Sequence, residues 1–188
     1  MLNIGLGESL GFPMPGYKFK VVDDDGDEVG AGQVGELLLR GPGVTKGYWG
    51  DTAATEAALT EDGWLRTGDL ARKGVLGAVV FAGRKKDVIK HGGYSVYALE
   101  VERVLEEHPD VLEAAVLGLP DERKGEVPVA AVRVASGVMF DADALKKWAE
   151  ERLSDYKIPQ QIVAVADLPR TGTNKVQRKE LISRFTPT

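Results

Sequence analysis

Alternating apolar and polar residues predict short strands in the first part of the chain. The run YKFKVV at 17–22 alternates aromatic or apolar residues with lysine, and VGELLLR at 34–40 is a short apolar run. The acidic segment at 23–33, DDDGDEVGAGQ, is typical of a solvated turn. Two further strands are expected at 64–71 and 75–82. Many short strands joined by glycine-containing turns predict a β-barrel-like unit.

Helical patterns follow at a few positions. Asp51 or Thr52 can cap a short helix that runs to position 59, and Asp141 can cap a longer one that runs to about position 153. Between these, the segment 96–107 places apolar residues at helical spacing with carboxylates between them, which predicts an amphipathic helix. The remaining elements expected are strands at 111–119, 127–134 and 162–165 and a last short helix at 177–185.

The charged pentapeptide GRKKD at 83–87 separates the strand-rich part from the helix-containing part, so we place a domain boundary there, with domains at 1–85 and 86–188. The expected fold class is α+β: a partial β-barrel-like subdomain, followed by a small α+β domain with a short central sheet. With 188 residues, 43% of them hydrophobic, the chain can bury a core.

Composition excludes several classes of function. The net charge is −5, and the 24 Lys and Arg are interspersed with 29 Asp and Glu, so we expect no nucleic-acid partner. Without cysteine and with two histidines, we expect no metal site and no thiol nucleophile. The turn at 23–33 fails the EF-hand spacing, because Gly26 comes too early and position 34 is valine.

The chain contains neither a signal-peptide pattern nor an apolar run long enough for a transmembrane segment. The lack of cysteine is compatible with a reducing compartment. We therefore expect a cytoplasmic protein, with peripheral association at a membrane left open.

Four polar clusters have chemical potential, and each also has a purely structural interpretation. Asp69, beside Gly68, could cap a turn or accept hydrogen bonds from two ribose hydroxyls. Arg84 could be a solvated charge or donate to the same sugar or a neighbouring phosphate. The glycines of His91-Gly92-Gly93-Tyr94 could form a turn or leave room for a ligand close to the backbone. Lys175, in a turn-rich loop, could be an exposed lysine or a mobile cation for phosphate or carboxylate.

Five motifs follow one another along the chain: GELLLRGPGVTKGYW at 35–49, GWLRTGD at 63–69, GRKKDVIKHGGYSVYALEVE at 83–102, GLPDERKGE at 118–126 and LPRTGTNKVQRKEL at 168–181. Their order and spacing resemble the carboxy-terminal motifs of the adenylate-forming superfamily, which includes acyl-CoA and aryl-CoA synthetases, luciferases and peptide-synthetase adenylation domains. The resemblance covers nearly the whole chain.

The resemblance implies the carboxy-terminal portion of an ATP-dependent acyl-CoA synthetase of the fatty-acid type. Such an enzyme activates a carboxylic acid as its AMP ester and transfers the acyl group to CoA. The substrates implied are therefore ATP, CoA and a carboxylic acid. The family's phosphate-binding loop and its Tyr-Gly-x-Thr-Glu segment do not occur here, so the chain is expected to need its own upstream large domain, to bind Mg²⁺ through that part, and to be inactive alone.

The family's functional residues carry over by position. Asp69 and Arg84 take the places of the residues that hold the ribose, and Lys86 takes the place of the hinge, with residues 86–188 as the mobile lid. Gly92 and Gly93 take the places of the glycines that line the CoA pantetheine tunnel, with Lys90 and Tyr94 as weaker candidates nearby.

Lys175 takes the place of the catalytic lysine, which contacts the carboxylate and the α-phosphate in the first half-reaction. The chain departs from the family where Asn174 replaces the usual glycine before that lysine; asparagine tolerates left-handed backbone angles. Two alternatives stay open: a peptide-synthetase adenylation domain or aryl-CoA ligase, and a non-catalytic module that binds nucleotide or CoA.

Overall fold

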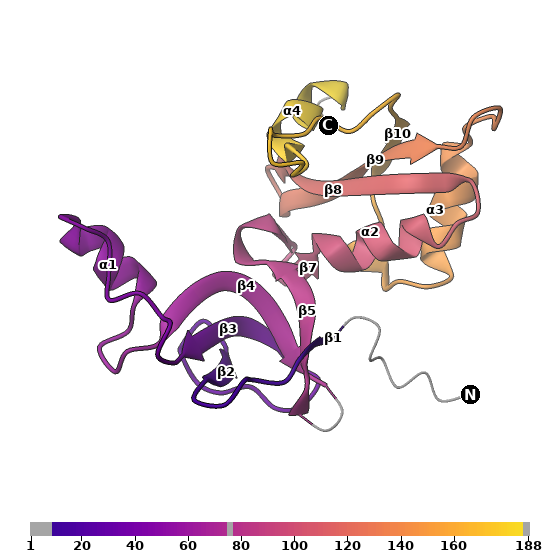
Figure 1. The fold of residues 1–188 in the computed structure, drawn as a ribbon. Helices are drawn as coiled ribbons and strands as arrows, with labels where there is room; N and C mark the ends of the chain where they lie inside the picture. The colour runs from indigo at the N-terminus through magenta and orange to yellow at the C-terminus, as the bar shows by residue number, and fades with distance from the viewer. Residues whose placement is uncertain (1–8, 75–76, 186–188) are drawn as a thin grey trace. The chain divides into compact units, whose positions relative to one another are not determined.

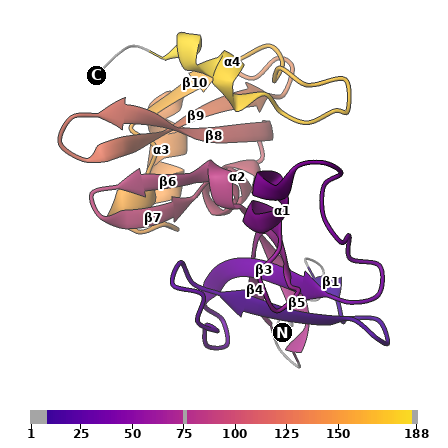
Figure 2. The same cartoon turned by 90° about the vertical axis from the view of Figure 1, so that its left-hand side faces the viewer.

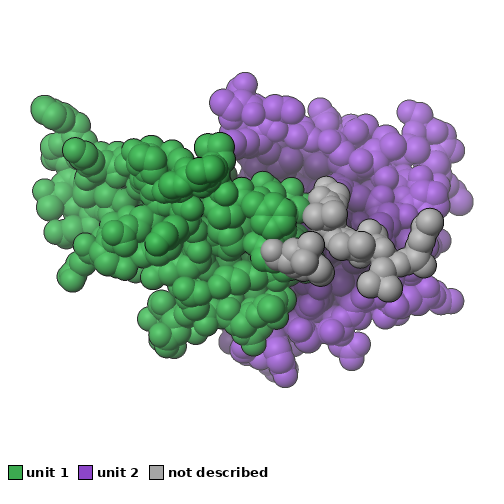
Figure 3. Space-filling view, turned by 60° about the horizontal axis from the view of Figure 1, so that its bottom comes forward, with its two compact units in different colours: residues 1–86 green, residues 87–188 purple. Residues whose placement is uncertain are grey.

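The computed structural model describes residues 9–74 and 77–185. The chain divides into two compact units, residues 1–86 and 87–188, each with its own sheet and its own core (Figure 1, Figure 3). Since the two units are consecutive in sequence, the chain passes from one to the other once, at the Lys86–Asp87 peptide bond.

Unit 1 is a five-stranded antiparallel sheet with the order β1-β5-β4-β3-β2, curled most strongly along β3 and β4 (Figure 1). One helix, α1, follows β3, and the Asp51 carboxylate caps it by accepting a hydrogen bond from the Ala54 N–H, as the sequence predicted. The elements are β1 (Ser9–Gly11), β2 (Lys18–Val22), β3 (Val34–Arg40), α1 (Thr52–Ala58), β4 (Leu65–Lys73) and β5 (Val79–Arg84).

Two details of unit 1 differ from the prediction. The short edge strand β1 was not expected from the sequence, because three residues are too few to show an alternating pattern. The strand expected at 75–82 starts later, at Val79, and ends at Arg84, so the charged pentapeptide begins inside a strand. Positions 75 and 76 lie outside the described residues.

Unit 2 contains a second sheet, and five strands where the sequence predicted three. The missed strands are β6 and β7, which form a hairpin directly after the unit boundary. The elements are β6 (Val88–His91), β7 (Tyr94–Tyr97), α2 (Ala98–Glu106), β8 (Val111–Asp121), β9 (Gly125–Val134), α3 (Ala142–Glu150), β10 (Gln161–Ala164) and α4 (Arg178–Leu181), with single 3-10 turns at 85–87, 155–157 and 182–184.

Three expected helices of unit 2 are shorter than predicted. The segment 96–107 begins in β7 and becomes helical only at Ala98; α3, capped by Asp141 as expected, ends at Glu150; and the last helix divides into α4 and a 3-10 turn. In the first case the error concerns the start of the segment. A single apolar residue such as Val96 can begin a helical or a strand pattern, so it cannot distinguish the two.

The long hairpin β8–β9 is the centre of unit 2, and both its faces are covered (Figure 2). Strand β10 pairs parallel with β9, and β6 pairs with the start of β9. The helices α2 and α3 pack on one face, and α4 with the segment before it packs on the other. This double coverage explains why β9 is apolar along most of its length and does not alternate, with Val129, Ala130, Ala131 and Val132 all buried.

None of the helices among residues 9–74 and 77–185 is both long and apolar enough to cross a bilayer.

Gly35, on β3, is a point of close backbone approach. A methyl group added there would lie 2.3 Å from the Val22 carbonyl oxygen and 3.1 Å from a Val21 methyl carbon. Neither the strand backbone nor the packed core can move far enough to remove such an overlap, so the position requires glycine.

Gly35→Ala is therefore expected to destabilise unit 1 by about 1–3 kcal/mol, the usual cost of overpacking a core. Gly172→Ala is the matched control, because a methyl group at Gly172 meets nothing within 4 Å. Urea unfolding followed through the tryptophans of unit 1 and through amide resonances of both units measures the effect. Equal stability of the two variants would show that β2 and β3 are not held as closely as described.

Candidate active site

Asp69 and Arg84 face each other across two neighbouring strands. They are register partners on β4 and β5, and the Arg84 Nε lies 2.8 Å from the Asp69 Oδ1. Asp69 is therefore not a turn cap, which was its structural interpretation from the sequence. Arg84 is the last residue of β5, so the pair lies two residues before the unit boundary.

The Asp69 Oδ1 atom is buried and, among the described residues, accepts no hydrogen bond despite the nearby guanidinium. The short distance without a hydrogen bond means that the Arg84 N–H is not directed at this oxygen. The Arg84 charge compensates this carboxylate, and the acceptor positions that the oxygen leaves unused suit a ligand that brings a hydroxyl donor. The local backbone fixes its direction: Gly68 has φ +69°, and the Asp69 N–H donates to the Thr67 Oγ1.

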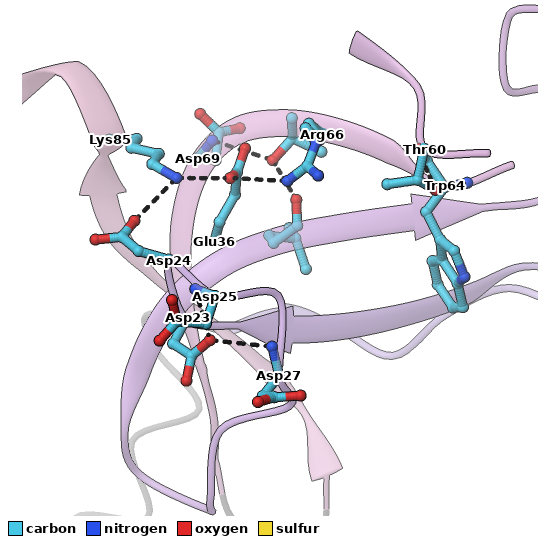
Figure 4. A network of polar contacts seen from close by, with 12 residues as sticks. Asp23, Asp24, Asp25, Asp27, Glu36, Thr60, Trp64, Arg66, Asp69 and Lys85 are labelled. Atoms are coloured by element: carbon cyan, nitrogen blue, oxygen red, sulfur yellow. Dashed lines mark hydrogen bonds and ion pairs between the residues drawn. The ribbon is translucent and has the colours of Figure 1, made fainter. Parts of the chain in front are cut away.

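Beside this pair, a charged network surrounds the buried carboxylate of Glu36 (Figure 4). The Lys85 Nζ lies 3.0 Å from the Glu36 Oε2 and 3.1 Å from the Asp24 Oδ1, and the Arg66 guanidinium is 4.0 Å from Glu36. The hydrogen bond to Glu36 raises the pKa of the Lys85 ammonium, with a smaller effect of the same sign from Asp24. Lys85 therefore remains charged and ties β5 to β3.

A hollow lies elsewhere in unit 1. It has a volume of about 600 Å³ and includes the basic side chains of Lys18, Arg40 and Lys46 in its wall. None of the predicted site residues lines it. The candidate site in unit 1 is therefore the Asp69–Arg84 pair and not the hollow.

In unit 2, Gly92 and Gly93 form the two-residue turn of the β6–β7 hairpin. Their φ angles are +57° and +85°, and such a turn needs positive φ at both central residues, which explains the glycines without any ligand. A side chain added at either position would meet nothing within 4 Å, so the space above the turn is open. The two interpretations left open by the sequence are thus compatible with each other.

The neighbours of the glycine turn are also fixed in position. The Lys90 Nζ donates to the Ser95 Oγ across the hairpin, and the Lys90 N–H donates to the Glu126 carboxylate. Tyr94, about half exposed, stacks on Tyr156 with a centroid separation of 4.5 Å. Tyr156 was not singled out from the sequence, because nothing local marks its contact with a residue 62 positions earlier.

Lys175 is exposed. In the described part of the chain its ammonium group forms neither an ion pair nor a hydrogen bond, and only its backbone forms hydrogen bonds. The loop that carries it is nevertheless ordered by its own backbone. The Thr171 N–H donates to the Lys175 carbonyl, the Lys175 N–H donates to the Thr171 Oγ1, and Asn174 adopts φ +62°. Asparagine thus takes the left-handed angles that the family's glycine would take.

A second interaction attaches this loop to the sheet. Arg170 donates from Nη1 to the Asn174 carbonyl oxygen, 3.1 Å away, and from Nη2 to the Glu113 carboxylate on β8, 2.5 Å away. Glu113 is held in turn by Arg133 on β9, at 3.0 Å. The peptide group that precedes Lys175 is therefore fixed to the β8–β9 hairpin by one arginine.

Within unit 2, the glycine turn and the Lys175 loop attach to opposite ends of β9. His91 pairs with Gly125 at the start of the strand, whereas Glu113, which holds Arg170, pairs with Arg133 near its end. Eight residues of extended chain between those points amount to about 26 Å at 3.3 Å per residue. The two attachment points are therefore well separated within the unit.

The structure adds one buried ion pair that the sequence analysis missed. Arg178 on α4 donates to the Glu102 carboxylate, 2.7 Å away, and to the Val116 carbonyl, and its Nη1 lies 3.4 Å from Asp87. A signal was present: Glu102 lies on the apolar side of its helix, beside Ala98, Val101 and Leu105. Its partner is 76 positions away, and no local pattern identifies it.

Among residues 9–74 and 77–185, no three or more His, Asp or Glu side chains are grouped so as to hold a metal ion.

Two family descriptions match this sequence: "AMP-binding enzyme C-terminal domain" at residues 100–175 and "AMP-binding enzyme" at residues 5–49. The indoleacetate–CoA ligase of Aromatoleum aromaticum is 41% identical over 95% of the chain, and the long-chain-fatty-acid–CoA ligase of Salmonella typhimurium is 39% identical over 92%. The chain spans 35% and 30% of the lengths of these relatives, respectively.

Among solved structures, the amide bond synthetase McbA from Marinactinospora thermotolerans superposes with a TM-score of 0.90 at 37% identity. The match covers 97% of this chain and 37% of that one. Both units therefore have counterparts in one larger protein.

Burial raises the pKa of the Glu102 carboxyl, and the Arg178 guanidinium opposes that shift. A carboxyl whose pKa is raised on folding binds its proton more tightly in the folded state. Its stabilising contribution is complete below the unfolded pKa of about 4.3 and is lost as the pH rises through the folded pKa. Glu102→Gln should remove this dependence, so the unfolding free energy of wild type minus that of the variant should fall with rising pH.

Urea unfolding at several pH values between 4 and 7 measures this difference. Glu107→Gln, the same change at an exposed position at the end of the same helix, is the control and should show no such trend. A flat difference for Glu102→Gln would mean that the carboxyl is not desolvated.

Proposed function

Because this chain is the carboxy-terminal portion of an enzyme of the adenylate-forming AMP-binding family, we propose that the protein containing it is an acyl-CoA synthetase. It would convert a carboxylic acid, ATP and CoA into acyl-CoA, AMP and pyrophosphate through an acyl-adenylate. The 188-residue chain would supply the ribose site, the hinge and the lid, and an upstream large domain would supply the acyl pocket and the phosphate loop. This chain alone would be inactive.

One observation of the structure carries the proposal: the buried Asp69 Oδ1, ion-paired with Arg84 at the end of β5, accepts no hydrogen bond from the described residues. Two ribose hydroxyls are donors of the type that a fixed carboxylate accepts, and the Arg84 fork can donate to the same sugar or to a phosphate. The chemistry present at this pair therefore fits the adenosine part of ATP and of the acyl-adenylate.

Lys175 would act in the first half-reaction. Attack of a carboxylate on the α-phosphate brings two anions together, and a cation between them stabilises the transition state more than the separated reactants. The ammonium lies exposed on a loop whose backbone is fixed through Thr171 and Arg170. It is thus presented at a defined position without a competing carboxylate among the described residues.

The glycine turn would act in the second half-reaction, in which the CoA thiol attacks the acyl carbon. Open space over Gly92 and Gly93 lets the pantetheine chain pass close to the backbone, with Lys90 and Tyr94 beside it. The separation of this turn from the Lys175 loop along β9 supports domain alternation, in which unit 2 turns about Lys86 and presents one loop after the other.

For the acid we propose a fatty acid, with an aryl acid as the alternative, since relatives of nearly equal identity are named for each. Mg²⁺ would be bound through the upstream part. Among the described residues, no three or more His, Asp or Glu side chains are grouped as ligands for it. We place the reaction in the cytoplasm.

The function is tested by ATP–pyrophosphate exchange and thioester formation with the whole protein, using a panel of fatty and aryl acids. CoA, a carrier-protein thiol and an amine are offered as acceptors. Exchange with a fatty acid and transfer to CoA support the proposal. Nucleotide binding without exchange, in a folded whole protein, would favour the non-catalytic module, and transfer only to the carrier thiol would favour a peptide-synthetase domain.

Lys175→Ala in the whole protein is expected to lower acyl-adenylate formation by about a hundredfold or more, the usual cost of removing a group that stabilises transition-state charge. Thioester formation from preformed acyl-adenylate should remain near the wild-type rate, because the lysine has left the site by then. Lys179→Ala, on the exposed side of α4, is the control. Equal loss of both steps would rule out the assignment.

A further inference from the structure

The unit boundary falls inside a single 3-10 turn, Lys85–Asp87. The middle residue of that turn, Lys86, is exposed and has neither an ion pair nor a side-chain hydrogen bond among the described residues. The residues on either side of it are both held by charged groups. This pattern of one unattached residue between two attached ones distinguishes Lys86 from its neighbours.

On the unit 1 side, Lys85 is held by Glu36 and Asp24 at 3.0 and 3.1 Å (Figure 4). Glu36 is 6% exposed, and apart from Lys85 its nearest cation is Arg66, 4.0 Å away. A buried carboxylate that loses its main partner is strongly unfavourable, so Lys85 cannot leave this position at low cost. The end of β5 is therefore fixed to β3.

On the unit 2 side, Asp87 is held by Arg178, which is itself fixed by three groups. The guanidinium contacts the Glu102 carboxylate and the Val116 carbonyl in addition to Asp87. Glu102 also accepts a hydrogen bond from the Val116 N–H at 2.8 Å. Asp87 is thereby tied to α2, β8 and α4 at once.

We propose that Lys85 and Asp87 are positioning residues: they confine the interdomain rotation to Lys86 and keep Arg84 against Asp69 while the lid turns. The inference rests on the proposed function. Arg84 is two residues from Lys86, and the nucleotide must stay bound in both half-reactions. If Lys85 were not fixed, torsion at the hinge would extend into β5 and move the Arg84 guanidinium away from the ribose site.

The first test is ¹⁵N relaxation of backbone amides 83–88 in the 188-residue chain, which reports how firmly the backbone on each side of Lys86 is held and not the slower rotation itself. In wild type, order parameters are expected near about 0.85 at Arg84, Lys85 and Asp87, with a minimum at Lys86. Lys85→Met should lower the values at Arg84 and Lys85 to below about 0.6, and Asp87→Asn should instead lower those at 87 and 88. Lys85→Arg, which keeps the charge, should restore the wild-type profile.

Lys73→Met is the matched control, because it removes a paired lysine of unit 1 that contacts Glu28 and not the boundary. Asp24→Asn removes one exposed partner of Lys85 and leaves Glu36 paired, so it tests the same clamp without endangering the fold. It should lower the same order parameters by a smaller amount. A wild-type minimum that already spans 84–88, or an unchanged Arg84 in folded Lys85→Met, would overturn the inference.

The second test is kinetic and uses the whole protein. Lys85→Met should raise the KM for ATP about fivefold, because a displaced Arg84 loses one partly exposed charged contact to the nucleotide, with a smaller change in kcat. An unchanged KM would contradict the positioning of Arg84. The relaxation measurement needs no activity, so failure of the proposed function would show as absent exchange, whereas failure of this inference would show in the relaxation profile.

Discussion

The single covalent passage between the two units, the Lys86–Asp87 peptide bond, is the constraint on which the other features depend. Each unit has its own sheet and its own core, so neither needs the other to bury its apolar residues. Rotation at this peptide would therefore not require either core to open. It would, however, be transmitted to any residue close by in sequence, and Arg84 is two residues away. The charged contacts of Lys85 and Asp87 hold the chain on either side of Lys86, and they keep such rotation from reaching Arg84.

The second unit has a geometric constraint of its own, which is the separation of two loops along one strand. Two loops of different chemistry, one glycine turn and one cationic loop, attach to opposite ends of β9. Because the β8–β9 hairpin is buried on both faces, it is stiff, and it keeps the two attachment points apart. Under the proposed function, this rigid unit would present its two loops in the two half-reactions by turning about Lys86.

Much of this fold could be predicted from the sequence, where the signal is local. The caps Asp51 and Asp141 and the strand at 34–40 are as expected, since capping side chains and short apolar runs act within a few residues. The β6–β7 hairpin was missed because four-residue strands containing Lys and His show little alternation. The partners of Glu102 and Glu36 are 76 and 49 positions away, and such contacts are decided by packing.

Asn174 shows why a departure from a family pattern need not change the site. The usual glycine is favoured there because left-handed backbone is free of cost only without a Cβ. In this chain the residue does adopt φ +62°, and the strain is offset by contacts that do not involve its side chain: Arg170 holds its carbonyl and Thr171 accepts its N–H. The loop geometry therefore resides in the surrounding hydrogen bonds, and through Arg170 it depends on Glu113 and β8. Changing Arg170 should disturb Lys175 more than changing Asn174 to glycine.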